Sequence, residues 1–198
     1  MILKMRFLLR YIQTGIILLF ISAPMFSQNT NDAIIYWNKH KRLTWSDFRG
    51  KVSPLDSATD NVAIASTDIS ILYENTGKRL TFKVVSYFRK NKSWTRDTIS
   101  EILLKHEQGH FDISELYARK LRKFLQNFNP KQSVQVLESG INLLTLEADV
   151  FQGKYDEETE HGKLKTKQAE WNNLINEELE QLNEYDVKNE ESKLEALK

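Results

Sequence analysis

The sequence predicts an α+β fold, in which a small antiparallel sheet packs on one long helix and two further helices follow. Short apolar runs and alternating stretches between residues 33 and 95 indicate strands. Apolar residues at steps of three and four from Thr98 to Asn127 indicate the long helix, and the same spacing returns twice beyond Pro130. The chain of 198 residues is long enough for one domain with its own core, which we expect over residues 29–185.

Residues 1–28 have the pattern of a signal peptide. An apolar run from Ile12 to Phe20 follows the basic residues Lys4, Arg6 and Arg10. The run is short for a permanent membrane span, and small residues precede a cleavage point that we place near Gln28. We therefore expect an exported protein, periplasmic or extracellular, with no stable membrane span after cleavage. An uncleaved N-terminal anchor is the alternative.

The rest of the composition excludes several classes of protein. The chain has no cysteine, which excludes disulfides, a lipid anchor on cysteine and a cysteine nucleophile. The 28 basic and 27 acidic residues are balanced, and no basic patch interleaved with aromatics indicates a nucleic-acid partner. Residues 186–198 form a charge-rich polar tail, for which we expect frayed helix or disorder.

Four stretches are predicted to form strands. Ile34–Trp37 and Leu43–Trp45 are short apolar runs, whereas Ala63–Tyr73 and Leu80–Val84 alternate apolar and polar side chains. Asn75-Thr76-Gly77 lies between the last two and is typical of a hairpin turn. The sequence therefore predicts an antiparallel pair at the centre of the sheet.

The long helix is predicted from Thr98 to Asn127. Thr98 and Glu101 form a capping-box pattern at its start, and Pro130 stops it. Two histidines lie where leucines would be expected, on the face that should be buried. The members of this stripe are Ile99, Ile102, Leu103, His106, His110, Ile113, Tyr117, Leu121 and Phe124.

Two further helices are predicted beyond Pro130, each from its own apolar stripe. Gly153–Gly162, between them, is predicted to be a loop, and it is dense in side chains that can bind a metal. The first stripe consists of Leu137, Ile141, Leu144, Ala148 and Phe151, and the second of Leu164, Trp171, Leu174, Ile175 and Leu182.

The two histidines belong to a His-Glu-x-x-His motif, His106-Glu107-Gln108-Gly109-His110. Residues at i and i+4 lie one above the other on a helix, so both imidazoles can reach one zinc ion. Glu107 is rotated off the histidine axis and can approach a water molecule on that ion as general base. Gly109 lowers helix propensity, a cost that is expected where another group must approach the backbone closely. The alternative is a pair of buried histidines that are hydrogen-bonded to their neighbours.

The motif and two other stretches resemble a family of bacterial predicted secreted zinc-dependent proteases, catalogued as domain of unknown function 922. The resemblance covers nearly the whole chain after the signal peptide and implies a zincin-like metallopeptidase fold. It rests on three stretches: Leu43-Thr44-Trp45-Ser46-Asp47-Phe48-Arg49-Gly50, His106 to Asp112, and Tyr155 to Gly162 followed by Gln168 and Trp171.

His161 is the third zinc ligand that we predict, with Asp156 and Glu147 as alternatives. Its imidazole is neutral near pH 7 and has no basic residue directly beside it, and Gly162 gives the backbone freedom to place it. The resemblance includes Thr159 and His161-Gly162 as a unit. Asp156 could instead orient a ligating imidazole from outside the coordination sphere, and Glu147 could face the long helix from its neighbour.

The function predicted is that of a zinc-dependent metalloprotease, a hydrolase of peptide or protein substrates. Zinc on His106, His110 and His161 would polarise the carbonyl, and Glu107 would move the proton. Tyr155 is a candidate donor to the developing oxyanion, with core packing as its other interpretation. Two alternatives remain: a non-catalytic envelope protein with a structural metal site, and a metal-dependent hydrolase of non-peptide amides.

Overall fold

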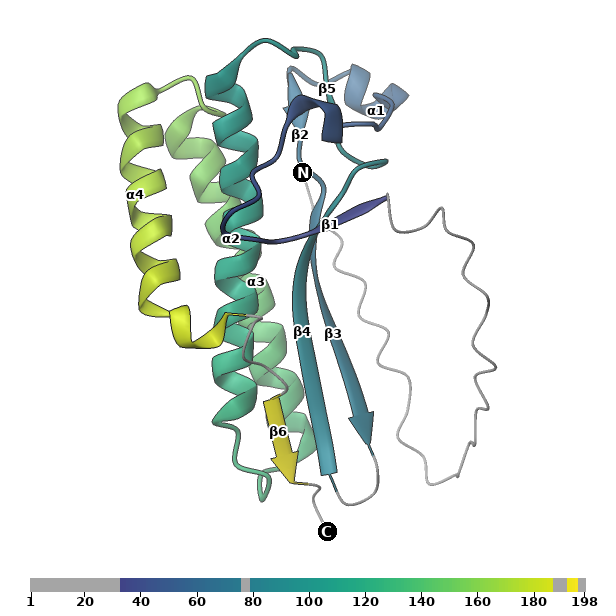
Figure 1. Ribbon diagram of the computed structural model, residues 1–198, viewed down its shortest axis with the longest axis vertical. Coiled ribbons are helices and arrows are strands. Elements are labelled where there is room, and N and C mark those ends of the chain that lie inside the picture. Colours follow the sequence, from purple (N-terminus) through teal and green to yellow (C-terminus); the bar gives the residue numbers. More distant parts are fainter. Residues whose placement is uncertain (1–32, 76–78, 187–191, 196–198) are drawn as a thin grey trace.

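The computed structural model describes residues 33–75, 79–186 and 192–195 (Figure 1). The predicted signal peptide lies outside these residues, so its cleavage stays a prediction. The predicted α+β class is confirmed, since small antiparallel sheets pack against three helices. Among the described residues, no helix is both long enough and apolar enough to cross a membrane.

The larger sheet is built around β4 (Arg79–Arg89), which pairs with β3 (Thr67–Asn75) along its whole length. The predicted hairpin is therefore confirmed, although residues 76–78 of its turn lie outside the described part of the chain. The other edge of β4 carries β1 (Ile34–Tyr36) at one end and β6 (Ser192–Glu195) at the other. The described part of the polar tail thus includes a strand, where frayed helix or disorder was expected.

A second sheet of two short strands, β2 (Ala63–Ile64) and β5 (Trp94–Thr95), lies beside the start of the long helix (Figure 1). The strand predicted at Leu43–Trp45 is wrong, because Trp45–Asp47 forms a 3-10 turn instead. That turn buries Leu43 and Phe48 in an aromatic cluster, with Phe48 and Phe88 ring centroids 5.1 Å apart. The remaining short helix is α1 (Pro54–Ser57).

The long helix, α2 (Glu101–Gln126), begins three residues later than predicted. Ser100, not Thr98, caps it, because the Ser100 hydroxyl accepts a hydrogen bond from the backbone N–H of Leu103 at 3.2 Å. Ile99 therefore precedes the helix and is 88% exposed, so the apolar stripe does not extend to this residue.

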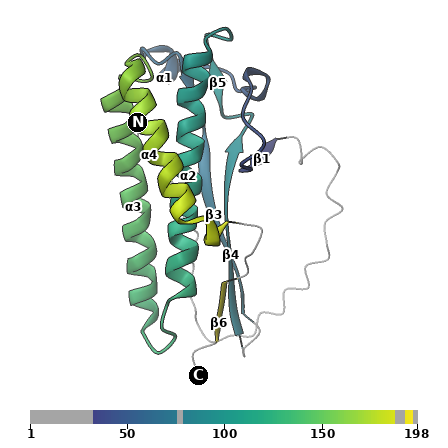
Figure 2. The same cartoon turned by 60° about the vertical axis from the view of Figure 1, so that its left-hand side comes forward.

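Helix α2 lies at the centre of the molecule, between the sheet and the other helices (Figures 1 and 2). The sheet covers one side, and α3 (Val134–Thr159) and α4 (Lys165–Gln181) cover the other. Because α2 is enclosed on most sides, even its polar positions are buried. The carboxylate of Glu115 is one example, since it pairs with the guanidinium groups of Arg119 and Arg122 at 3.0 Å.

Helix α3 continues through Gly153 to Thr159, so the predicted loop over these residues is wrong. Tyr155 and Thr159 are fully buried, and their packing outweighs the low helix propensity of Gly153. Only Glu160–Leu164 connects α3 to α4, and Glu160, His161 and Gly162 all have positive φ angles there. The sharp left-handed turn leads the chain into α4 and places Gly162 directly against His106 of α2.

Candidate metal centre

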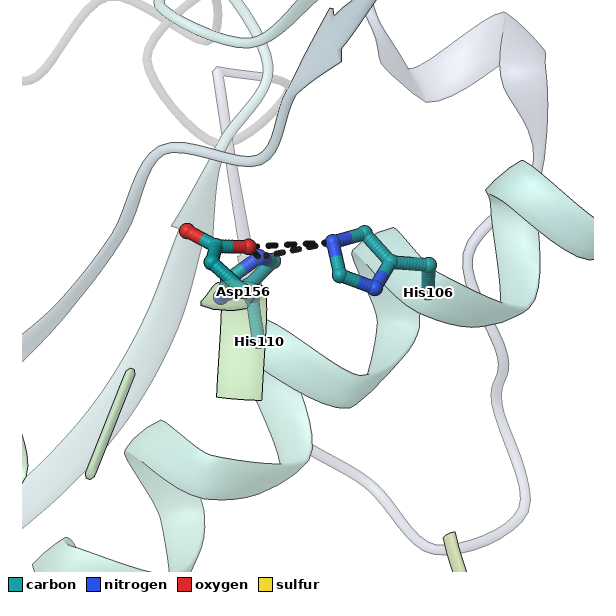
Figure 3. Close-up of side chains that lie close together, drawn as sticks. All are labelled: His106, His110 and Asp156. Carbon is teal, nitrogen blue, oxygen red and sulfur yellow. Dashed lines mark hydrogen bonds and ion pairs between the residues drawn. The ribbon is translucent and has the colours of Figure 1, made fainter. Parts of the chain in front are cut away.

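Three side chains of the kinds that can bind a metal converge between α2 and α3 (Figure 3). The Oδ1 atom of Asp156 lies 3.1 Å from Nε2 of His106 and 2.9 Å from Nε2 of His110. The two Nε2 atoms lie 3.2 Å apart. The predicted pairing of the two histidines across one helical turn is therefore present, and α3 supplies a carboxylate at the same point.

The tautomer of His106 follows from its neighbours. Tyr155 donates its hydroxyl hydrogen to the backbone carbonyl of His106 at 3.0 Å, so its oxygen can accept from the side-chain amide of Gln168 at 2.6 Å. The Gln168 carbonyl oxygen is then left facing Nδ1 of His106 at 3.0 Å. Because a carbonyl can only accept, Nδ1 carries the proton and Nε2 offers a lone pair.

Gln152 holds His110 in the same way. Its amide nitrogen donates to the backbone carbonyl of His110 at 3.0 Å, which turns its carbonyl oxygen toward Nδ1 of the same histidine at 2.6 Å. Nδ1 of His110 therefore donates, and Nε2 again offers a lone pair toward Asp156.

Two nitrogen lone pairs and a carboxylate oxygen thus lie close together and repel one another. Only a metal cation or an additional proton between them would relieve this repulsion. Their separations of 2.9–3.2 Å are close to the edge of a tetrahedron of zinc ligands, about 3.3 Å for bonds of about 2.0 Å. Neutral imidazole and carboxylate are also donors that zinc accepts. The donor set therefore fits a zinc ion in both geometry and chemistry.

The ionisable groups of the centre shift one another's pKa values. Burial lowers the pKa of His110, but the hydrogen bond and charge of Asp156 outweigh this effect and raise it to about 9. For His106, burial dominates and lowers the pKa. Burial disfavours the charged form of Asp156, but the close contacts with the two histidines prevail and hold its pKa well below the ordinary value. In the absence of a metal, a proton on His110 balances the carboxylate.

Glu107 is buried beside this centre and is not one of its three donors. Its Oε2 atom accepts a hydrogen bond from the backbone N–H of Ala65 at 2.6 Å, just after β2. Burial raises the pKa of Glu107 to about 7, against the opposing effects of His110 and the Ala65 N–H. The second sheet therefore fixes the orientation of the carboxylate that the motif provides.

His161 lies next to the three donors. Its Nδ1 atom is 3.3 Å from the same Oδ1 atom of Asp156, and its side chain is 56% exposed. Asp156 thus lies between His161 and the histidine pair, and the predicted role of His161 as third ligand stays a prediction. Glu147, the other alternative, is exposed on α3 and is not part of the three-residue cluster.

Residues 42–162 match the family described as bacterial protein of unknown function (DUF922). The chain belongs to the DUF922 family. No curated protein and no solved structure matches the chain. The family named in the sequence analysis is thus confirmed, and the protease activity attached to it stays a prediction.

The DUF922 match spans the whole donor set together with Glu107 and Gln152, whereas Gln168 lies just beyond it. Sequence reasoning missed the role of Gln152, because nothing in the local pattern distinguishes it from other polar helix residues. Gln168 could be singled out from the sequence, because it is one of the residues, with Trp171, on which the family resemblance rests.

Gln108 and Asp112, which belong to the same stretch of the DUF922 motif, anchor the segment that precedes the 3-10 turn. Asp112 accepts hydrogen bonds from Arg42 at 2.8 and 3.2 Å and from the indole of Trp37 at 2.8 Å. The side-chain oxygen of Gln108 accepts from the backbone N–H of Leu43 at 2.7 Å. These side chains leave the helix on the side away from the histidines and hold residues 37–43 against it.

Proposed function

We propose that this protein is an exported zinc-dependent metallopeptidase in which His106, His110 and Asp156 hold the metal and Glu107 is the general base. One observation carries the proposal. Two imidazole lone pairs and a carboxylate converge at one point, beside a buried glutamate that takes no part in that contact. The peptide bond as substrate rests on the resemblance of the motifs to the predicted proteases.

The residues of the chain have distinct roles in this mechanism. Zinc, when bound, supplies a Lewis acid that polarises a substrate carbonyl and lowers the pKa of a water molecule. Gln168 and Gln152 keep the lone pairs of the two imidazoles directed at one point. Glu107, held by the Ala65 N–H, takes a proton from the attacking water and returns it to the leaving amine.

The experiment that tests this proposal pairs metal content with hydrolysis. The exported protein is analysed for zinc by elemental analysis and assayed on a panel of unfolded proteins and peptides. We expect about one zinc per chain, and Glu107→Ala should keep the zinc but lose at least about 100-fold in rate. Glu101→Ala, an exposed glutamate of the same helix, is the matched control and should leave both unchanged.

A structural metal site is the second candidate, and the position of His161 favours it. Structural zinc sites use four protein ligands, and His161 could complete such a set because its Nδ1 lies only 3.3 Å from Asp156. In that case His161→Ala would lower zinc affinity as strongly as His106→Ala, and Glu107→Ala would change nothing measurable. Activity on non-peptide amides alone would assign the centre to a different hydrolase.

A further inference from the structure

The outer face of α3 carries an exposed apolar stripe that the metal centre does not use. Figure 2 shows α3 at the outer edge of the helical layer, with its other face toward α2 and α4. Three of the four buried residues of α3, Ile141, Ala148 and Tyr155, recur every seven positions on that inner face, and Thr159 is the fourth. The outer stripe consists of Val136, Leu143, Leu146 and Val150, which are 45, 57, 60 and 64% exposed.

The spacing of this stripe is that of a helix-pairing seam. Steps of seven, three and four place Val136, Leu143 and Val150 at position a of a heptad repeat and Leu146 at position d. Ser139 and Gly153 occupy the remaining d positions and are small enough to let another helix approach. An exposed apolar stripe of this kind marks an interaction surface, and the heptad spacing indicates that the partner is a helix.

We propose that two copies of this chain form a dimer in which their α3 helices lie side by side and parallel. Valine at two of the four a positions with leucine at d is the combination that favours two-stranded pairs. Leu143 holds a third a position, and Glu157 at the fourth ends the apolar seam in the last turn of α3. The same stripe on each copy is self-complementary, as a two-fold interface requires. The stripe itself contains no donor of the metal centre, although Asp156 lies on its flank, seven residues after Asp149.

The charges beside the stripe select the parallel orientation. In a parallel pair, a g position faces the e position five residues further along the second copy. Asp149 is at g and Lys154 is at e, so each Asp149 would meet Lys154 of the other copy. Lys154 already lies 3.5 Å from Glu158 in its own chain, but both side chains are exposed and such a pair is weak.

An antiparallel pair lacks this complementarity. Like flanks then face one another, and the flank of Asp149 otherwise holds Gln135, Asn142 and Asp156, which offer no positive charge. On the other flank, Glu147 of one copy could meet Lys154 of the other only if the midpoint of the antiparallel pair lay beyond Val150, halfway between residues 147 and 154. That register would leave Val136 without a partner, because α3 ends at Thr159.

The first test is the oligomeric state of the exported protein, produced from the full-length chain and measured by analytical ultracentrifugation. We expect a dimer at micromolar concentration and a loss of at least about 100-fold in dimer affinity for Leu146→Glu, because the substitution removes a buried leucine from both copies. The control is Leu174→Glu, at an exposed leucine on α4 outside the stripe, which should remain dimeric. A wild type that stays monomeric throughout this range would overturn the proposal.

The second test reads the orientation, and it uses the fact that the chain has no cysteine of its own. In the parallel pair, residue 150 of one copy faces residue 150 of the other, so Val150→Cys should form a disulfide-linked dimer on mild oxidation. Leu174→Cys should not. Charge exchange gives an independent reading: Lys154→Asp should weaken the dimer, and Lys154→Asp with Asp149→Lys should restore it. Dimers that resist Leu146→Glu, or that fail to cross-link at position 150, would show that another face or orientation is used.

Discussion

Gly109 and Tyr155 are in direct backbone-to-ring contact. A Cβ atom on Gly109 would lie 2.7 Å from Cζ of the Tyr155 ring, a distance that side chains do not tolerate. Because the ring lies this close to α2, the Tyr155 hydroxyl reaches the backbone carbonyl of His106 and donates its hydrogen to it. Tyr155 is fully buried and stacks on the His106 ring at 4.6 Å, so the interpretation of Tyr155 as core packing accounts for it, and its hydroxyl is not free for an oxyanion.

Gly109→Ala should therefore lower the free energy of unfolding by about 1–3 kcal/mol, although alanine is the better helix former. The matched control is Gly153→Ala in α3, where an added Cβ meets nothing within 4 Å. That substitution should raise the free energy of unfolding by up to about 1 kcal/mol. Urea unfolding measures both, and equal effects of the two substitutions would contradict the packing argument.

Asp156→Ala should cost orders of magnitude in zinc affinity, because its Oδ1 atom touches both histidine nitrogens. Glu147→Ala, on the same helix, should cost nothing. His161→Ala should cost roughly 10- to 100-fold if the imidazole only supports Asp156, and far more if it is a ligand. Competition with a zinc-binding dye measures all three, and full affinity in Asp156→Ala would return the third position to His161.

Gln168→Met and Gln152→Met should each weaken zinc binding by roughly 10- to 100-fold, because each releases one imidazole from its Nδ1–H tautomer. Gln181→Met, an exposed residue at the end of α4, is the control. Nitrogen-15 chemical shifts of the imidazoles provide a second measurement. A variant that keeps the Nδ1–H signal of its histidine would show that the glutamine does not set the tautomer.

Zinc binding should release about one proton per chain at pH 7. The pKa of His110 is raised to about 9 in the metal-free protein, so the ring is protonated at pH 7, whereas zinc needs it neutral. Apparent affinity should therefore rise by about tenfold per pH unit between pH 6 and 8. Titration calorimetry in buffers of different ionisation enthalpy counts the proton, and a pH-independent affinity would exclude this exchange.

Glu115→Ala should lower the free energy of unfolding by about 3–5 kcal/mol, because it leaves the guanidinium group of Arg122 buried without its carboxylate and that of Arg119 with Asp186 in place of two carboxylates. Glu170→Ala removes the exposed pair with Lys167 and should cost less than about 1 kcal/mol. Chemical denaturation compares the two. A small effect at Glu115 would mean that Asp186 and the backbone carbonyls around the arginines are sufficient partners.

The helix, its histidine pair and the β3–β4 hairpin could be predicted because each depends on local spacing. An i, i+4 pair meets on any helix, and alternation across a turn gives an antiparallel pair wherever the fold places it. Asp156 could be named as a candidate ligand but not chosen, since its position depends on how α3 packs on α2.

The error at Gly153–Thr159 has a similar cause. A glycine followed by acidic residues has the local features of a loop, and only the burial of Tyr155 and Thr159 against other helices makes the segment helical. The contacts of Gln152 and Gln168 with the histidines likewise exist only in the assembled fold.

The donors of the proposed centre come from two helices that are distant in the chain, and this separation has a mechanical consequence. A metal held by His110 and Asp156 would close a loop of 46 residues (156 − 110), much as a disulfide does. The chain has no cysteine, so the ion would be its one covalent-like cross-link. Resistance to unfolding, and to attack by proteases, would then track the supply of zinc.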